Sequence, residues 1–581
     1  MEKATLYRSG KHTIPPYTLA WNMYGAGLES LGHDGQPEAF PVPQPGPDQM
    51  LVRVDCVGLC SSDIKILRQG PAHPKLYGRD LRKEPTRLGH ETAVTVMAVG
   101  ENLKGQYFPG QRLAIQPDIY QQGKSTAYGY TVPGGLIQYH LIGPEVLETD
   151  TGACVLPVED DLSYAAIALL EPWGCVLAAY TQRRRLTPKQ GGIMWIVGHP
   201  DDPTPYTWSG GMGAPATIVL TDVPPVIEEM ARQTGAEVVV RNGLRVEEYT
   251  ALAEEMTQGR GFDDIVVLDP QHAEQASAIL ALMARWGTVN FVGSKPLDAP
   301  AQVDAGRVHY DFLAILGNPG PDIGASYGEA RNRCDLRPGG VALFLGAGGP
   351  MGQMHVQRAL ELPNGPQVVI ATDISAERLA VLEQMFNPLA EQQGRTFLAF
   401  NPMTSERSLA EVVDAYTDGR GADDVVVCAP VAGLMAEGGQ LLAEDGLLVL
   451  FAGVPPGTLI PLDVSRVYLH GAQYTGTSGL TIEDQAAVLQ RAVAGELYVE
   501  RSVAAIAGMK AARDGLQALM EGRYAGKILI YPQLEDLPLL SLSELAEQYP
   551  DIGAHLGPNF LWTKEAEAAL IEHFWRVPVE V

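Results

Sequence analysis

The stretch VALFLGAGGPMG at 341–352 decides the fold of the second half of this chain. Its first half has the composition of a buried strand, and its glycine-rich half leads into a run typical of a helix. A strand, a tight turn and a helix in that order present backbone amides to a pyrophosphate. The residues expected to form this coenzyme turn are Gly346, Ala347, Gly348, Gly349, Pro350, Met351 and Gly352.

An acidic residue stands where such a turn needs one. Asp373 ends the next apolar run, 21 residues after Gly352 (373 − 352). A carboxylate at this place binds the ribose diol of a dinucleotide and repels a 2′-phosphate, so it favours NAD over NADP. Arg378, which follows shortly after, keeps NADP open; its other interpretation is a solvated helix charge.

The coenzyme turn lies in the second of two repeated segments. The nonapeptide GRGFDDIVV at 259–267 returns as GRGADDVVV at 419–427, an offset of 160 (419 − 259). Strands and helices alternate around both, which predicts two tandem, doubly wound parallel sheets. We place them at 188–336, the first copy, and at 337–480, the coenzyme copy.

The first copy has lost the glycine-rich turn. Its equivalent segment at 197–205, VGHPDDPTP, contains three prolines and two carboxylates. A helix cannot run normally through those prolines, and the carboxylates would repel a pyrophosphate. We therefore expect the first copy not to bind a dinucleotide in the usual way, and to serve as a structural duplicate or an oligomer surface.

The rest of the chain has a different texture. Residues 1–187 contain many short strands with Gly and Pro turns, which predicts a β-rich, barrel-like domain. The segment 481–533 is expected to hold a helix and a strand that return to this domain. The last segment, 534–581, is predicted to be a helical extension whose aromatic residues dock on the body or on another subunit.

Metal-ligating residue types gather in the first third of the chain. Cys60, His90, Glu91 and Glu171 offer sulfur, nitrogen and oxygen donors, a mixture that suits Zn²⁺ better than Mg²⁺ or Ca²⁺. Adjacent strand residues point to opposite faces, so His90 and Glu91 should not both face inward. One would be a ligand, and the other would enter on rearrangement or orient the site. The alternative is an ancestral site without metal.

Two polar residues follow Cys60 closely. Ser62 is a candidate relay that accepts the proton of an alcohol; otherwise it is a turn serine that bonds its own backbone. Asp63 either bonds an imidazole behind the metal or caps a turn.

Composition excludes several function classes. A net charge of −27 argues against nucleic acid as a partner. No apolar run is long enough to cross a bilayer, and the N-terminus lacks the apolar core of a signal peptide. The six cysteines form no Cys-x-x-Cys pair, which favours a reducing, cytoplasmic setting.

Three segments carry a family resemblance: VGLCSSDIK at 57–65, LGHETAVTVMAVGENLKG at 88–105 and LLEPWGCVLAAY at 169–180. Together with the coenzyme turn, they resemble the zinc-dependent medium-chain dehydrogenase/reductase family. Within that family, the similarity is to its L-sorbose-1-phosphate reductase-like and polyol dehydrogenase members.

The resemblance implies a GroES-like β-barrel catalytic domain joined to Rossmann-like units. It implies that Cys60, His90 and Glu171 bind a catalytic zinc, that Glu91 is an alternate ligand, and that Ser62 is the relay hydroxyl. It further implies hydride transfer between NAD(P) and a polyol, sugar or sugar phosphate, in a dimer or tetramer. No cysteine lies between Cys60 and Cys154, so we expect one zinc and no structural zinc.

Several alternatives stay open. A phosphorylated substrate needs cations, which the loop after Cys60 could supply unless it is only a solvated loop. These cations are Arg68, Lys75, Arg79, Arg82 and Lys83. The competing functions are a zinc-free quinone or enoyl reductase and a non-catalytic nucleotide-binding scaffold.

Overall fold

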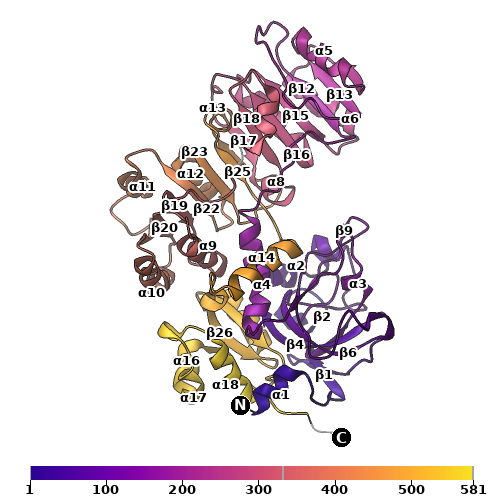
Figure 1. The fold of residues 1–581 in the computed structure, drawn as a ribbon, viewed down its shortest axis with the longest axis vertical. Coiled ribbons are helices and arrows are strands. Elements are labelled where there is room, and N and C mark those ends of the chain that lie inside the picture. Colours follow the sequence, from indigo (N-terminus) through magenta and orange to yellow (C-terminus); the bar gives the residue numbers. More distant parts are fainter. Residues whose placement is uncertain (1, 330–332, 579–581) are drawn as a thin grey trace. The chain divides into compact units, whose positions relative to one another are not determined.

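The computed structural model describes residues 2–329 and 333–578. The chain divides into two compact units (Figure 1). The first unit joins the residues up to Ala178 to those from Gly479 onward, and the second unit comprises Ala179–Ser478. Each unit is described by itself below.

The first unit is built on an eight-stranded sheet in the order β11-β7-β6-β4-β27-β26-β28, with β10 also paired to β4. The strand β27 comes from the far end of the sequence and pairs antiparallel with β4, so the C-terminal return completes the N-terminal sheet. The strands are β4 (Met50–Gly58), β6 (Glu91–Val99), β7 (Arg112–Ile115), β10 (Tyr139–Ile142), β11 (Val155–Val158), β26 (Val503–Gly508), β27 (Lys527–Tyr531) and β28 (Leu540–Ser541).

Shorter elements complete this unit. Two-stranded pairs form between β1 (Tyr17–Ala20) and β3 (Glu38–Pro41), β2 (Asn22–Met23) and β5 (Thr86–Arg87), and β8 (Tyr120–Gln121) and β9 (Lys124–Ser125). The helices are α1 (Glu2–Ser9), α2 (Ser61–Gln69), α3 (Pro144–Leu147), α4 (Tyr164–Ala178), α14 (Ile482–Val493), α15 (Ala512–Glu521), α16 (Leu542–Gln548), α17 (Pro550–Gly553) and α18 (Lys564–Phe574).

Helix α4 is buried along almost its whole length, as its apolar sequence requires. The C-terminal extension caps it: the backbone N–H groups of Tyr164 and Ala165 donate to the carboxylate of Glu567 on α18, at 2.7 and 2.9 Å. A carboxylate is stabilising at the positive end of a helix dipole. Trp575, just after α18, is 1% exposed. The extension therefore docks on the body of its own chain.

The second unit contains two six-stranded parallel sheets with the same strand order. In each, the third, second and first strands are followed by the fourth, fifth and sixth, which is the doubly wound order. The first copy uses β14 (Glu237–Val240), β13 (Thr217–Thr221), β12 (Ile193–Val197), β15 (Phe262–Leu268), β16 (Met283–Val292) and β18 (Ala314–Asn318). The coenzyme copy uses β21 (Thr396–Phe400), β20 (Val368–Thr372), β19 (Val341–Leu345), β22 (Ala422–Val427), β23 (Leu442–Leu450) and β25 (Gln473–Thr475).

The predicted fold class is confirmed: a β-rich domain accompanies two parallel α/β sheets (Figure 1). A further antiparallel pair, β17 (Ala301–Asp304) with β24 (Leu459–Leu462), joins the two copies. The helices of this unit are α5 (Pro225–Gln233), α6 (Tyr249–Thr257), α7 (Ala273–Ala281), α8 (Ala305–Tyr310), α9 (Pro350–Glu361), α10 (Ala376–Gln392), α11 (Leu409–Thr417), α12 (Ala432–Leu441) and α13 (Ser465–Leu469).

The repeated aspartate pair has a structural role. In the first copy, Arg185 precedes the first strand and donates to the carboxylate of Asp264 at 2.8 Å and to the backbone oxygen of Asp263 at 2.7 Å. The second copy repeats the arrangement with other residues of the same types. Those residues are Arg333, Asp423 and Asp424. This aspartate clamp fixes the entry of the chain into each sheet.

The two copies differ after their first strands. In the coenzyme copy, β19 is followed by α9, whereas residues 198–216 of the first copy form no helix before β13. There the hydroxyl of Tyr206 donates to Asp202 at 2.6 Å and helps to close the loop. The first copy therefore has no helix N-terminus where a pyrophosphate would bind, as its prolines predicted.

Candidate active site

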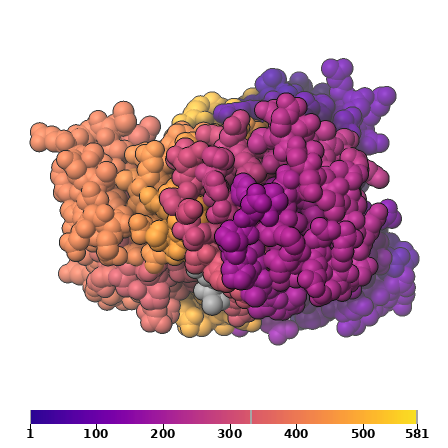
Figure 2. Space-filling view, turned by 90° about the horizontal axis from the view of Figure 1, so that it is seen from above, coloured from indigo at the N-terminus to yellow at the C-terminus, as the bar shows by residue number. Residues whose placement is uncertain are grey.

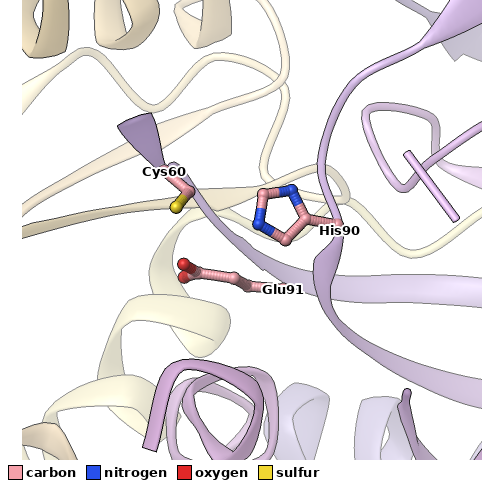
Figure 3. Close-up of side chains that lie close together, drawn as sticks. All are labelled: Cys60, His90 and Glu91. Atoms are coloured by element: carbon pink, nitrogen blue, oxygen red, sulfur yellow. The ribbon is translucent and has the colours of Figure 1, made fainter. Parts of the chain in front are cut away.

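Cys60, His90 and Glu91 form a group with metal-ligand chemistry in the first unit. One ligand atom from each residue lies within 4.8 Å of the others. In Figure 3 the thiol, the imidazole ring and the carboxylate turn toward a common space. Three donors of different kinds that converge in this way fit a Zn²⁺ site with a position left for substrate.

Local backbone geometry explains the convergence. Cys60 follows β4 and is the N-cap of α2, while Glu91 is the first residue of β6 and lies opposite Gly58. A Cβ atom at Gly58 would overlap the Glu91 carboxylate. Only glycine at this position lets the carboxylate lie across β4.

The expectation that His90 and Glu91 could not both face the centre was wrong. That expectation assumed a regular strand through both residues, but β6 begins at Glu91. His90 belongs to the preceding turn, where Gly89 has a φ of 92°, a value that favours glycine. Because His90 lies outside the strand, the alternation of side chains does not apply to it.

Asp63 holds the group from behind. Its carboxylate accepts hydrogen bonds from the backbone N–H groups of Cys60 and Gly89, at 2.9 and 3.0 Å. Its Oδ1 also lies 3.3 Å from Nδ1 of His90, which leaves Nε2 of that ring for a metal. Burial alone would lower the pKa of His90, but the charge and hydrogen bond of Asp63, with the Cys60 thiol, raise it well above its usual value. Asp63 thus fills both predicted roles, as a turn cap and as the partner of the imidazole.

Glu91 has one paired and one unpaired oxygen. Its Oε1 contacts the ammonium of Lys527 on β27, and both side chains are almost fully buried. Its Oε2 is buried without a hydrogen-bond partner. A buried carboxylate oxygen without a partner is costly unless a ligand satisfies it, so this atom fits a bound cation. Sequence reasoning missed Lys527, although a lysine at the start of the apolar strand KILIY was a signal.

Glu171 lies close to this group but is not one of the three converging residues. It projects from α4 beside Pro172, which lies inside the helix, and it is 6% exposed. Burial raises the pKa of Glu171 to about 7; the charge of His90 opposes this shift, and the charge of Glu91 adds to it. Its role as a zinc ligand stays a prediction.

Ser62 lies in the first turn of α2 and interacts with the phenol of Tyr130. The centre of the Tyr130 ring lies 5.9 Å from that of the His90 ring. The ammonium of Lys75 lies 4.9 Å from the centre of the Tyr130 ring. Burial raises the pKa of Tyr130, while His90, Lys75 and Ser62 lower it in part. Tyr130 is a second residue near the metal group that sequence reasoning missed, because it lies in a loop without periodicity.

The other loop cations form ion pairs with neighbouring acids or are exposed. Arg79 and Lys83 pair with Glu84 and Asp80, at 4.0 and 3.8 Å. Arg68 and Arg82 are exposed.

The strand, tight turn and helix predicted from residues 341–352 are present in the second unit. Gly346 has a φ of 72°, the Ala347 N–H donates to Thr372, and α9 begins at Pro350. A Cβ atom at Gly352 would lie 2.5 Å from the Cα of Ala347, so glycine allows the helix to pack against the strand.

Asp373 lies at the turn, directly after β20. Its Oδ2 accepts a hydrogen bond from the Gly348 N–H at 3.0 Å, and its Oδ1 accepts one from the Ser375 N–H at 2.9 Å. A Cβ atom at Gly348 would lie 2.8 Å from the Cβ of Arg378, so Arg378 starts next to the same turn. The geometry fits the binding of a ribose by Asp373 and leaves the choice between NAD and NADP open.

Family models match both units. The model described as "Alcohol dehydrogenase GroES-like domain" matches residues 46–148, and the one described as "Zinc-binding dehydrogenase" matches residues 350–494. Solved structures agree on the fold: 2R,3R-butanediol dehydrogenase from Bacillus subtilis is 16% identical with a TM-score of 0.50. It covers 89% of this chain, and the match covers 99% of that chain.

Similar proteins of known name are dehydrogenases and reductases. The mannitol-1-phosphate 5-dehydrogenase of Aliivibrio fischeri is 24% identical over 93% of this chain and 96% of its own length. The L-sorbose 1-phosphate reductase of Klebsiella pneumoniae is 22% identical over 96% and 98%. The sorbitol dehydrogenase of Bacillus subtilis is 28% identical, but over 50% of this chain and 81% of its own length.

A zinc-type, nicotinamide-dependent dehydrogenase is defined by the two matched domains, by the coenzyme turn, and by the metal-ligand group of Cys60, His90 and Glu91, here called the donor group. The chain belongs to the medium-chain dehydrogenase/reductase family of zinc-dependent alcohol and polyol dehydrogenases, and its substrate is a small molecule. None of the helices in the described part of the chain combines the length and the apolar character that a bilayer crossing requires.

Proposed function

We propose that the protein oxidises a secondary alcohol of a polyol, sugar or sugar phosphate to a ketone, and catalyses the reverse reduction. NAD is the proposed coenzyme, because Asp373 lies at the coenzyme turn; NADP is the alternative that Arg378 leaves open. The observation that carries the proposal is the convergence of Cys60, His90 and Glu91, together with the buried Glu91 oxygen that has no hydrogen-bond partner.

The proposed roles of the residues follow from their positions. Cys60, His90 and Glu171 hold one catalytic zinc, and Glu91 is the alternate ligand. Zinc, when bound, supplies a Lewis acid that makes an alcohol proton easier to remove. Ser62 would accept the hydroxyl proton, and a bound nicotinamide would take the hydride from the carbon that carries the hydroxyl, so the alcohol would lose two electrons and two hydrogens. No structural zinc is proposed.

The relatives support a substrate with several hydroxyl groups. The two that match almost the whole chain are named for phosphorylated substrates, whereas the sorbitol dehydrogenase matches half of it. Lys75 is the loop cation that lies beside Tyr130, and it is the proposed contact for a phosphate. It forms an ion pair with Asp118 at 3.7 Å, and its side chain is 38% exposed.

A substrate screen tests the proposal. Purified protein is assayed with polyols and sugar phosphates, with NAD⁺ and NADP⁺, by the absorbance of the reduced nicotinamide, before and after a chelator. We expect turnover that the chelator abolishes and zinc restores. Turnover that survives complete metal removal would instead support a zinc-free quinone or enoyl reductase. Coenzyme binding without turnover and without zinc would support a nucleotide-binding scaffold.

A cysteine pair sharpens the screen. Cys60→Ser should abolish zinc binding and turnover while coenzyme affinity stays within about twofold of wild type. Cys154→Ala, at a buried cysteine outside the donor group, is the matched control and should keep both zinc and activity. Full activity in Cys60→Ser would contradict the zinc mechanism. The expected compartment is the cytoplasm, and the expected assembly is a homo-oligomer, which a native mass measurement tests.

A further inference from the structure

The two α/β copies contact each other through equivalent strands. β17 of the first copy pairs antiparallel with β24 of the coenzyme copy, with Gln302 opposite Pro461. The sequences QVDAGRVH at 302–309 and PLDVSRVY at 461–468 align at an offset of 159 (461 − 302). Gln302 and Pro461 are therefore equivalent residues, and the paired strands are related by a local two-fold axis between them. The two copies lie side by side in both views (Figures 1 and 2).

Contacts on either side of this axis obey the same symmetry. Tyr468 of the coenzyme copy packs on Gly317, where a Cβ atom would overlap it. His309 occupies the equivalent position in the first copy (468 − 309 = 159) and packs on Gly476 (476 − 317 = 159). A Cβ atom at Gly476 would lie 3.1 Å from the Cα of His309.

The interface between the copies is part of one apolar core. The β17 and β24 side chains that flank the axis are at most 2% exposed, and the hydrophobic cluster around them includes residues of both sheets. These side chains are Ala301, Val303, Ile460 and Leu462. A self-complementary interface around a two-fold axis is the arrangement by which two identical subunits usually associate. Here both halves belong to one chain.

The symmetry is broken where a coenzyme would bind. In a doubly wound sheet, the half formed by the fourth to sixth strands receives the second mononucleotide, here the nicotinamide half, at the carboxyl ends of the strands. At the end of β23, His309 Nδ1 lies 3.2 Å from the Leu450 oxygen. A Cβ atom at Gly453 would overlap the Tyr310 hydroxyl and lie 2.9 Å from His309 Nε2. The first copy thus places two side chains at this edge.

We propose that the first copy is a built-in partner of the coenzyme copy and that its His309 and Tyr310 shape the nicotinamide half of the coenzyme site. This proposal rests on the proposed use of NAD or NADP. At the opposite end of the same interface, Tyr468 faces the first copy, whose dinucleotide turn has been replaced by a loop without a helix. Tyr468 therefore makes the equivalent interface contact without a coenzyme nearby.

The two ends of the interface provide a matched test. His309→Ala and Tyr468→Ala are compared for melting temperature and, by titration calorimetry, for the affinity of whichever of NADH and NADPH the wild type binds. Both variants should melt earlier. His309→Ala should weaken coenzyme binding about five- to tenfold, whereas Tyr468→Ala should change it less than about twofold. Equal effects on affinity would overturn the role of His309.

Milder variants keep the test decisive if the alanine variants fail to fold. Tyr310→Phe and Tyr468→Phe each remove one hydroxyl, and only Tyr310→Phe should alter coenzyme affinity or the KM for coenzyme. Unchanged values in Tyr310→Phe would contradict its placement at the site. A wild type that binds neither nucleotide would refute the proposed function itself, which separates the two failures.

The partner role has a readout that needs no coenzyme. Val303→Glu puts a charge into the interface and should lower the melting temperature of the full chain without changing its native mass, because both halves are in one chain. The control Gln302→Glu changes an exposed side chain of the same strand and should melt like wild type. A loss of native mass in Val303→Glu would show that the contact forms between chains, and an unchanged melting temperature would show that it contributes nothing.

Discussion

The ammonium of Lys527 contacts the carboxylate of Glu91, although 436 residues separate the two in the sequence. Both side chains are buried, at 2% and 0% exposure. Lys527 lies on β27, which pairs with β4, and β4 pairs in turn with β6, where Glu91 begins the strand. The C-terminal return of the chain therefore supplies the charge partner of a residue in the candidate metal centre.

Removing this lysine should destabilise the metal-free protein. Lys527→Met leaves the Glu91 carboxylate buried without a counter-charge, which costs about 3–5 kcal/mol when a buried ion pair is broken. Zinc should recover part of this loss because it offers Glu91 a cation. The measurement is the free energy of unfolding in a chelator and in excess zinc.

A second substitution serves as the control. Glu91→Gln added to Lys527→Met removes the unpaired charge, so the double variant should be more stable than Lys527→Met alone in the chelator. If the single and double variants unfold alike, Lys527 does not act through Glu91.

Asp63→Asn should weaken zinc binding. Asp63 accepts hydrogen bonds from two backbone N–H groups and lies against Nδ1 of His90, so it fixes the ring orientation. Loss of such a partner behind a metal ligand typically costs about 10- to 100-fold in affinity. Competition with a chromogenic chelator measures the affinity, and Asp80→Asn, at a surface residue, should leave it unchanged. Wild-type affinity in Asp63→Asn would mean that the imidazole is held by other contacts.

Asp373→Ser should change coenzyme preference. Without the carboxylate, the ribose of NAD loses its acceptor and the 2′-phosphate of NADP loses a repulsive charge. The ratio of kcat/KM for NADP⁺ to that for NAD⁺ should rise by about tenfold or more. Asp222, after the second strand of the first copy, is the matched control, because its carboxylate accepts from Gly243 and no pyrophosphate helix lies beside it. An unchanged ratio in Asp373→Ser, or an equal rise in Asp222→Ser, would contradict the assigned site.

Glu500 should make stability depend on pH. Burial raises the pKa of Glu500 from 4.5 to about 7, with the nearby Glu567 adding to the shift and Ser163 opposing it. Since the folded state binds this proton more tightly than the unfolded state, stability falls as pH rises from about 4.5 to about 7. Glu500→Gln should remove this slope and be more stable than wild type above pH 7, by on the order of 2–4 kcal/mol. The free energy of unfolding of wild type and variant is measured at pH 5 and at pH 8. The same pH dependence in Glu500→Gln would assign this dependence to another group.

The sequence was most informative where local pattern and chemistry coincide. The apolar run before Gly346, the turn and Asp373 lie within one strand–helix–strand segment, so their spacing alone placed them together. The lost helix of the first copy was predictable for the same reason, because proline acts on its own segment.

Long-range partners could not be predicted in this way. Lys527 reaches Glu91 only because β27 returns to β4, and no local pattern specifies strand pairing over such a separation. Tyr130 approaches His90 from a loop without periodicity. The orientation of His90 was misjudged because one residue decides where β6 begins, and strand ends are the least certain part of a sequence pattern.

The aspartate clamp has a consequence for tracing such duplications. The residues of this clamp, among them Asp264 and Asp424, are separate from those that would hold a nucleotide, such as Gly348 and Asp373. A duplicated copy can therefore lose the residues that would hold a nucleotide and still keep its parallel sheet. A genome search built on the GRGxDDxVV signature would recover copies with and without the glycine-rich turn, and only the glycines of that turn would tell them apart.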